Sequence, residues 1–425
     1  TDADTDADTD SDPDLDQDGF PASVDCDDQD PDVSPGAAEV CDGIDNDCDV
    51  AIDESGTPVD WYPDLDGDGY GDPGAPTASC AAPAEHVLDG SDCDDTREDV
   101  FPGAPVDTCD YADTDCDGLV EELRVPADFA TLDAAVAAAV SGDTICLADG
   151  THTGRLVVAG LTLAVRSLNG PAQTVLDASS TNLRAVLVDA GADLTVEGLT
   201  VTSSAGAVRV RNNGRLTLRD SVLQDSTAAS GAGLLVDTNG GAVVVEDTVI
   251  RRNTATGPQP LGGGIAHLST VPLTVRRTLL EDNTVDCTAG GAWYGGGLLT
   301  QGPATLEDVD VIGNTVVCQV AQGSGIAVRN PQGALDATRV RVLDNTGDAT
   351  QLTAGAVVVL NGSATLESVV IAGNTAIGGV SVEGAGLWVG NGATADVSHA
   401  TITRNSATAP SASGLGVYVG TGALG

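Results

Sequence analysis

A repeat of about thirty residues constrains the fold of this chain more than any other feature. The repeat has two signatures: a block such as TLLEDNTV with one asparagine, and a glycine-led apolar block such as GGGLLT. Three short β-branched runs fall in each unit, which is typical of a solenoid whose coils pack only on their neighbours. The repeated asparagines are Asn253, Asn283, Asn314, Asn345, Asn374 and Asn405.

The repeat also predicts contacts between neighbouring coils. Equivalent residues of stacked parallel coils lie about 4.8 Å apart. The asparagines are therefore expected to form an internal amide ladder. Cys287 and Cys318 each follow a ladder asparagine by four residues, so we predict a disulfide between them. The segment ATLDAAVAAAV (130–140) is predicted to be a short helix that precedes the first strands.

On these blocks, residues 125–425 resemble the right-handed parallel β-helix of the pectin-lyase-like class. The asparagine blocks are also similar to repeats of chlamydial-type polymorphic surface proteins. The resemblance implies a helix that covers the first open edge of the stack. The expected fold is therefore mainly β: a right-handed parallel β-helix (solenoid) with an N-terminal loop-rich, disulfide- and calcium-stabilised domain.

Charge separates that N-terminal part from the rest. The chain has 65 acidic and 17 basic residues, for a net charge of −48. Residues 1–124 hold 40 of the acids and two arginines, hence 2 − 40 = −38. Such a charge excludes nucleic acid and anionic membranes as partners, and no apolar run is long enough for a transmembrane segment. Because the chain does not start with methionine, we expect a processed or trimmed form.

Seven of the ten cysteines lie in the same acidic part. Their density indicates the disulfide framework of an exported protein. Zinc is a weaker interpretation, because the four histidines are scattered and no CxxC pair occurs. We also expect Cys146, in the first coil, to pair with a cysteine of the acidic part.

The acidic part contains two copies of one pattern, and each copy starts with DxDxDG; the DCDD and PGA blocks that follow are 67 residues apart. Alternate carboxylates followed by a turn glycine are typical of a calcium loop. In the first loop the predicted ligands are Asp14, Asp16, Asp18, the Phe20 carbonyl and Asp25 at the twelfth position. In the equivalent loop of the second copy they are Asp64, Asp66, Asp68, the Tyr70 carbonyl, Asp72, and Asp92 in place of a twelfth-position acid.

Each copy also holds a second aspartate triplet with acids close behind it. The predicted calcium ligands are Asp45, Asp47, Asp49, Asp53 and Glu54 in the first copy, and Asp113, Asp115, Asp117, Glu121 and Glu122 in the second. Val50 stands where the second copy has Gly118. A segment with this charge and few apolar residues cannot collapse unless cations neutralise it, so we expect its folding to require calcium and disulfides.

The pattern DCDDxDPxxxPGAxExCDGxDNDCDG resembles a metal-binding motif that is repeated in surface proteins of myxobacteria and related bacteria. The resemblance covers about residues 14–122; the departures are Val50 and the variant CDYADTDC at 109–116. It implies an extracellular metal-binding module and names no enzyme. Residues 1–13 continue an alternation of aspartates and are interpreted as a solvated arm or linker, or as a strand bound to cations or a partner.

The expected function is that of an extracellular calcium-binding structural protein of a bacterial cell surface. We expect a homo-oligomer, assembled head-to-tail into a filament or surface layer, because the repeat ends after a strand with no capping helix. The alternatives are a surface adhesin that binds glycans and, less favoured, a polysaccharide lyase or hydrolase. The arginine clusters, such as Arg209/Arg211 and Arg276/Arg277, lack a tight carboxylate constellation in the sequence, so we expect solvated strand positions. Trp293 and Trp388 are interpreted as loop packing or sugar-stacking residues.

Overall fold

The computed structural model describes residues 13–54, 56–104, 109, 113–116, 122–287, 292–420 and 423–424. The chain forms two compact units, Thr1–Val120 and Glu121–Gly425. The division lies four residues before the boundary expected after residue 124, because β4 (Glu122–Val125) pairs with β5 (Thr144–Leu147) of the second unit.

The first unit consists mostly of loops. Its described strands form one antiparallel sheet in the order β2 (Thr77–Ser79), β1 (Val59–Pro63), β3 (His86–Val87). Val33 and Val100, at equivalent positions of the two copies, are 2% and 0% exposed. Cys26–Cys48 and Cys93–Cys116 are equivalent disulfides within the two copies, and Cys41 of the first copy bonds Cys80 of the second. Cross-links of this density stabilise small domains with little apolar core.

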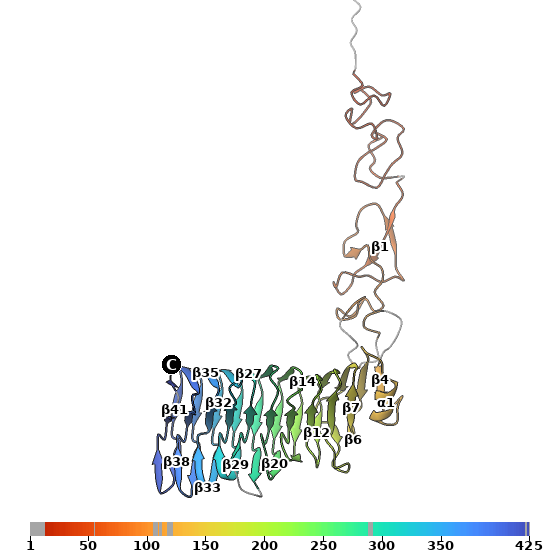
Figure 1. The fold of residues 1–425 in the computed structure, drawn as a ribbon. Coiled ribbons are helices and arrows are strands. Elements are labelled where there is room, and N and C mark those ends of the chain that lie inside the picture. Colours follow the sequence, from red (N-terminus) through yellow and green to blue (C-terminus); the bar gives the residue numbers. More distant parts are fainter. Residues whose placement is uncertain are drawn as a thin grey trace, which may run out of the picture. The chain divides into compact units, whose positions relative to one another are not determined.

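The second unit is a parallel β-helix with four sheets, whose coils lie side by side (Figure 1). Sheet I contains β7 (Leu156–Ala159), β10 (Val186–Asp189), β13 (Val208–Val210), β17 (Leu234–Val236), β21 (Ile265–His267), β26 (Leu298–Thr300), β30 (Ile326–Arg329), β34 (Val357–Leu360), β39 (Leu387–Gly390) and β44 (Val417–Val419). Sheet II contains β4, β5, β8 (Thr162–Ser167), β11 (Asp193–Glu197), β14 (Arg215–Arg219), β18 (Val243–Glu246), β22 (Leu273–Arg276), β27 (Pro303–Glu307), β31 (Ala334–Thr338), β35 (Ser363–Glu367), β40 (Thr394–Ser398) and β45 (Ala423–Leu424).

Sheets III and IV complete each coil. Sheet III contains β6 (Gly150–Thr153), β9 (Thr174–Asp177), β12 (Thr200–Thr202), β15 (Val222–Gln224), β19 (Val249–Arg251), β23 (Leu279–Glu281), β28 (Asp310–Ile312), β32 (Arg341–Leu343), β36 (Val370–Ala372) and β41 (Thr401–Thr403). Sheet IV contains β16 (Thr227–Ala228), β20 (Thr254–Gly257), β24 (Thr284–Cys287), β25 (Ala292–Tyr294), β29 (Thr315–Gln322), β33 (Thr346–Ala354), β37 (Thr375–Gly378), β38 (Ser381–Glu383), β42 (Ser406–Thr408) and β43 (Ser411–Ser413).

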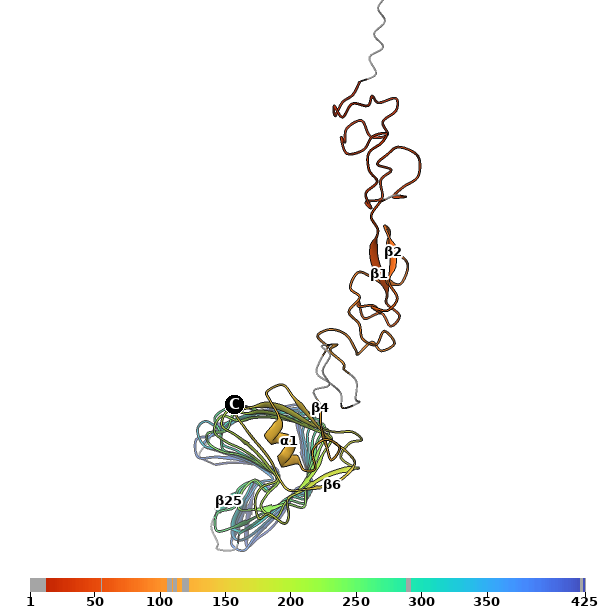
Figure 2. The same cartoon turned by 90° about the vertical axis from the view of Figure 1, so that its right-hand side faces the viewer.

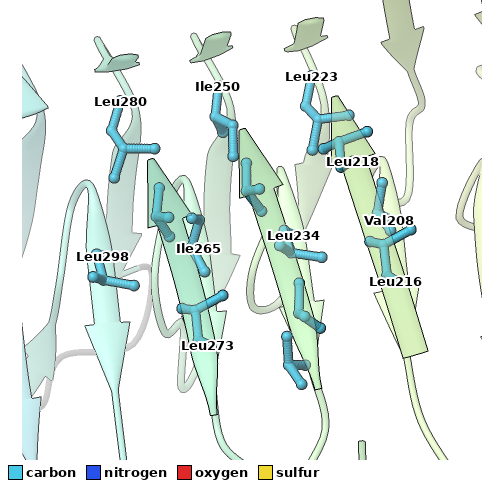
Figure 3. Packing of buried hydrophobic residues seen from close by; sticks show 14 of the residues in the cluster. Val208, Leu216, Leu218, Leu223, Leu234, Ile250, Ile265, Leu273, Leu280 and Leu298 are labelled. Atoms are coloured by element: carbon cyan, nitrogen blue, oxygen red, sulfur yellow. The ribbon is translucent and has the colours of Figure 1, made fainter. Parts of the chain in front are cut away.

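Aliphatic side chains stack in columns inside the coils. In sheet III, Leu223 pairs with Ile250 and Ile250 with Leu280 in the parallel register. In sheet I, Leu234, Ile265 and Leu298 form a second column that faces the same interior (Figure 3). All of these side chains are 0% exposed. Each such burial contributes about 1.5–3 kcal/mol, so the core is built from one repeated layer.

A short helix closes the start of this core. Helix α1 (Leu132–Ala138) begins after Thr131, whose side chain accepts a hydrogen bond from the Ala134 amide. Leu132 and Ala135 are buried, and α1 lies across the end of the coils when they are viewed along the stack (Figure 2). The predicted helix and its position at the first coil are therefore confirmed.

Candidate metal centre

The first DxDxDG loop is shaped by its own carboxylates. Asp16 Oδ1 accepts a hydrogen bond from the Asp18 amide at 3.1 Å, and Asp18 Oδ1 accepts one from the Phe20 amide at 2.9 Å. Asp14 Oδ2 accepts from the Gly19 amide at 3.2 Å, and Gly19 has a φ of +109°. One ligand oxygen from each of Asp14, Asp16 and Asp18 lies within 4.8 Å of the others. Three carboxylates therefore converge on one point of the turn.

The equivalent loop of the second copy repeats this geometry. Asp66 Oδ1 accepts from the Asp68 amide at 3.2 Å, and Asp68 Oδ1 accepts from the Tyr70 amide at 2.9 Å. Asp64 Oδ1 accepts from the Gly67 amide at 2.8 Å. The Tyr70 ring stacks on Phe101, with 5.7 Å between ring centroids, so an aromatic pair supports the end of this loop.

Each loop holds three buried carboxylate oxygens that have no hydrogen-bond partner in the described structure. They are the Oδ2 atoms of Asp16, Asp18 and Asp25 in the first copy, and of Asp66, Asp68 and Asp92 in the second. Asp25 is 8% exposed and Asp92 is 1% exposed. Buried polar atoms without partners are costly, and here they recur at the same positions of both copies. A bound cation satisfies such oxygens, so the residues fit a metal ion.

The electrostatics of the two loops agree with that fit. Desolvation, and then the charges of Asp18, Asp25 and Asp14, raise the pKa of Asp16. Desolvation and the neighbouring charges of Asp68 and Asp66 likewise raise the pKa of Asp92. Repulsion among carboxylates raises their pKa values, and a divalent cation between them removes that repulsion.

Both predicted closing residues lie at their loops. Asp25 and Asp92 supply buried oxygens to the same cradle as the aspartate triplets. Two further acids reach the loops: Asp28 Oδ1 accepts from the Leu15 amide at 3.0 Å, and Asp95 Oδ1 accepts from the Leu65 amide at 2.7 Å. From the sequence, Asp28 and Asp95 are expected only as positions for further cations and not as parts of the loops, although their shared offset of 67 residues was a usable signal.

The second triplet of the first copy has the same local structure. Asp45, Asp47 and Asp49 place ligand oxygens within 4.8 Å of one another. Val50 has a φ of +84° and is 90% exposed, so it keeps the left-handed conformation of the missing glycine. A β-branched residue is strained there.

Glu39 is a candidate ligand that the sequence analysis missed. It is 6% exposed, and its two carboxylate oxygens accept hydrogen bonds from the Asp47 and Asp53 amides at 2.8 Å each. Glu39, Asp47 and Glu54 form a further convergent group. In the sequence, this glutamate is visible in the AEVCDG block. The spacing of a calcium loop does not predict that it contacts the aspartate triplet.

Two predicted ligands, Asp53 and Asp72, have other surroundings. Asp53 Oδ1 accepts from the Asp42 and Gly43 amides at 3.2 and 3.1 Å. Asp72 Oδ1 accepts from the Gly74 amide at 2.7 Å, in a separate turn. In the fourth cluster, Asp117, Glu121 and the side chain of Glu122 lie outside the described residues, as does the arm apart from Pro13.

The predicted amide ladder and the predicted disulfide of the second unit are confirmed. Asn283 Nδ2 donates to Asn314 Oδ1 at 3.0 Å, and the other ladder pairs have the same bond at 2.9–3.0 Å. Cys287 bonds Cys318 with 4.9 Å between the Cα atoms. Cys109 and Cys146 are also disulfide-bonded, and none of the cysteines is free in the described residues.

The expectation for the arginine clusters was wrong in one respect. These side chains are partly exposed, but many pair with carboxylates of the adjacent coil instead of remaining solvated. Arg277 lies 2.7 Å from Asp247, and Arg339 lies 2.6 Å from Asp308. Trp388 is 7% exposed and its Nε1 donates to Glu383, whereas the side chain of Trp293 lies outside the described residues. The partners in these arginine–aspartate pairs are about 30 residues apart in sequence, and only the folded coils bring them together.

Comparisons with known proteins agree with both units. A family model described as "Putative metal-binding motif" matches residues 25–54 and 92–122. A model described as a right handed beta helix region matches residues 178–407. No curated protein and no solved structure matches the chain significantly, and no helix among the described residues is long and apolar enough to cross a membrane. Because the second match covers more than half of the chain, the chain belongs to the right-handed β-helix family.

Proposed function

We propose that this protein is an extracellular, calcium-binding structural protein of a bacterial cell surface. The observation that supports it best is the set of buried, unpartnered carboxylate oxygens at equivalent positions of two loops. Calcium takes six to eight oxygen ligands in flexible loops of this kind. The disulfides are compatible with secretion, because such bonds persist in oxidising compartments.

The name of the matched metal-binding model refers to copper, so the metal has to be argued from this chain's donors. The chain has no methionine, its cysteines are disulfide-bonded, and His86 is the one histidine among residues 1–124. Carboxylate and carbonyl oxygens suit calcium, whereas thiolate, thioether and imidazole ligands suit copper. Calcium is therefore favoured over copper.

Calorimetric titration of chelator-treated protein tests the metal. We expect calcium to bind in the presence of excess magnesium, with a gain in thermal stability of the first unit. Copper that binds more tightly than calcium, with no loss in a variant lacking Asp16 and Asp66, would contradict the proposal.

For the second unit we propose a mechanical, non-catalytic role. The asparagine ladder and the cross-coil ion pairs join neighbouring coils and favour a stiff spacer. Several arginines that could serve a lyase as base are instead engaged with carboxylates, as in Arg341–Asp310. A depolymerisation assay on acidic polysaccharides should show no turnover; measurable product would support the enzyme alternative.

Head-to-tail self-association is part of the proposal. Its physical basis is that the edge of a parallel sheet can pair with a further strand, and that heterologous contacts that do not close produce filaments. Electron microscopy of the full chain with calcium and after chelation tests it. Filaments that dissolve on chelation are expected, whereas a monomer under both conditions together with a positive glycan array would favour the adhesin alternative.

A further inference from the structure

A cavity on the second unit is lined by four of the chain's seventeen arginines. Its volume is about 370 Å³, and Arg155, Arg184, Arg209, Arg211 and Asn182 face it. We propose that this cavity binds an oxyanion group, that is, a sulfate, phosphate or carboxylate, as a free ion or as a substituent of a saccharide. The inference is independent of the metal sites.

The cavity is built around a fixed guanidinium. Arg184 Nη1 donates to the carbonyls of Val208 at 2.8 Å and Gly231 at 2.7 Å. Gly206, with a φ of +96°, lies against this side chain, and a Cβ there would be 2.7 Å from Arg184 Nη1. The turn therefore needs glycine to admit the arginine. Backbone carbonyls from two segments, at Val208 and Gly231, hold this cation in place, which preorganises it for a ligand.

Charge inside the cavity is positive, although the chain is strongly acidic. Arg209 lies 2.7 Å from Asp237, and Arg211 lies 2.6 Å from Asp189. Arg184 donates to carbonyls only, and Asp237, whose charge also acts on Arg184, is itself paired with Arg209.

Arg155 is the second unbalanced cation. Its Nε donates to the Arg184 carbonyl at 2.8 Å, and its terminal nitrogens have no partner among the described residues. Four guanidinium groups against two carboxylates leave an excess of about two positive charges in a chain of net charge −48. Desolvation and the charge of Arg209 lower the pKa of Arg184 to about 10, so it stays protonated at neutral pH.

This arrangement favours an oxyanion over other ligands. Guanidinium forks match the planar or tetrahedral oxygens of carboxylate, sulfate and phosphate. Leu183, Leu187 and Ala205 complete the lining, so its polar part consists of the arginines and Asn182. Nucleic acid is excluded because the overall charge would repel it.

Calorimetric titration of the full chain at low chloride tests the proposal, with sodium sulfate, a sulfated disaccharide and its unsulfated form as probes. We expect sulfate or the sulfated disaccharide to bind, and the unsulfated sugar not to bind. Tight binding of sulfate alone indicates a free ion, and preference for the sulfated disaccharide indicates a saccharide substituent. No binding of either sulfate or the sulfated disaccharide, or equal binding of the unsulfated form, overturns the proposal.

Arg155→Glu should weaken binding at least tenfold, because it removes free donors and adds a like charge to the ligand. Arg215→Glu is the matched control, with the same change in net charge outside the lining, and should change affinity less than twofold. Arg155→Lys keeps the charge but not the fork and should lose less affinity than Arg155→Glu; this second variant keeps the test valid if Arg155→Glu does not fold. Equal losses in Arg155→Glu and Arg215→Glu would show that only the overall charge matters.

Discussion

Asp25 and Asp92, 67 residues apart, occupy the same position in two copies of one loop, and each buries an Oδ2 atom that has no hydrogen-bond partner in the described structure. The other oxygen of each accepts an amide hydrogen bond, from Asp27 at 2.9 Å and from Asp94 at 2.8 Å. One oxygen thus shapes the backbone while the other is left without a protein partner. This division of labour is what a carboxylate ligand in a preformed loop requires.

Asp92→Asn should remove one calcium site and leave the fold of its loop. The amide oxygen can keep the hydrogen bond from Asp94 while the ligand charge is lost, so we expect at least tenfold weaker binding at that site by calorimetry. Asp72→Asn is the control, because Asp72 bonds Gly74 in a separate turn. An equal loss of affinity in both variants would disprove the assignment of Asp92 as a ligand.

Val50→Gly should strengthen the second triplet of the first copy. Val50 has a φ of +84°, and a β-branched residue pays about 1–3 kcal/mol for such a conformation. Glycine removes this strain, so calcium affinity at Asp45, Asp47 and Asp49 should rise several-fold. Val40→Gly, at an exposed position, controls for added chain flexibility; unchanged or weaker binding in Val50→Gly would refute the strain argument.

Acid should destabilise the second unit through His267. This residue is 1% exposed, its Nε2 lies 2.9 Å from the Val271 carbonyl, and desolvation lowers its pKa to about 4. The unfolded chain binds the proton with a pKa near 6.5. The contribution of His267 to the free energy of unfolding is therefore complete above pH 6.5. It is lost as the pH falls toward 4, and the loss is about 3 kcal/mol in all.

Denaturant unfolding at pH 4.5 and pH 7 measures this dependence. His267→Gln should flatten the pH profile in that window, whereas the exposed His399→Gln should leave it intact. If the free energy of unfolding of the wild type does not decrease when the pH is lowered below 6.5, a buried neutral histidine is excluded.

Breaking the asparagine ladder should cost more than losing one hydrogen bond. Asn314 is 0% exposed; its amide nitrogen donates to Asn345 Oδ1 at 3.0 Å, and its own Oδ1 accepts from Asn283. Asn314→Ala leaves buried donors unpaired, each worth about 1–3 kcal/mol. Chemical denaturation should show a loss of at least about 2 kcal/mol, against less than about 0.5 kcal/mol for the exposed Gln351→Ala. Comparable losses would mean that the ladder does not stabilise the coils.

Most of the β-helix could be predicted because its contacts are translations of one unit. A fixed repeat places Asn283 beside Asn314 and Cys287 beside Cys318, so sequence spacing alone identifies the partners. The aspartate triplets could be predicted for a related reason, since their geometry is set within six residues.

The remaining contacts depend on turns whose paths the sequence does not reveal. Glu39 reaches Asp47 and Asp53 only after the intervening loop folds back. The pairing of Arg277 with Asp247 requires both residues to adopt the same left-handed turn in adjacent coils. In the sequence, such side chains look like ordinary solvated charges.

The sequence by itself therefore determined the coil period, the internal ladder and the local DxDxDG loops, because these depend on spacing along the chain. Only the tertiary structure decided which acids lie against each loop and which arginines gather in one cavity. Arg155, Arg184 and Arg209 are 25 to 54 residues apart, and the coils bring them within one 370 Å³ space. The physical reason is that charge–charge contacts act through space, whereas sequence patterns report only neighbours along the chain or at a fixed repeat.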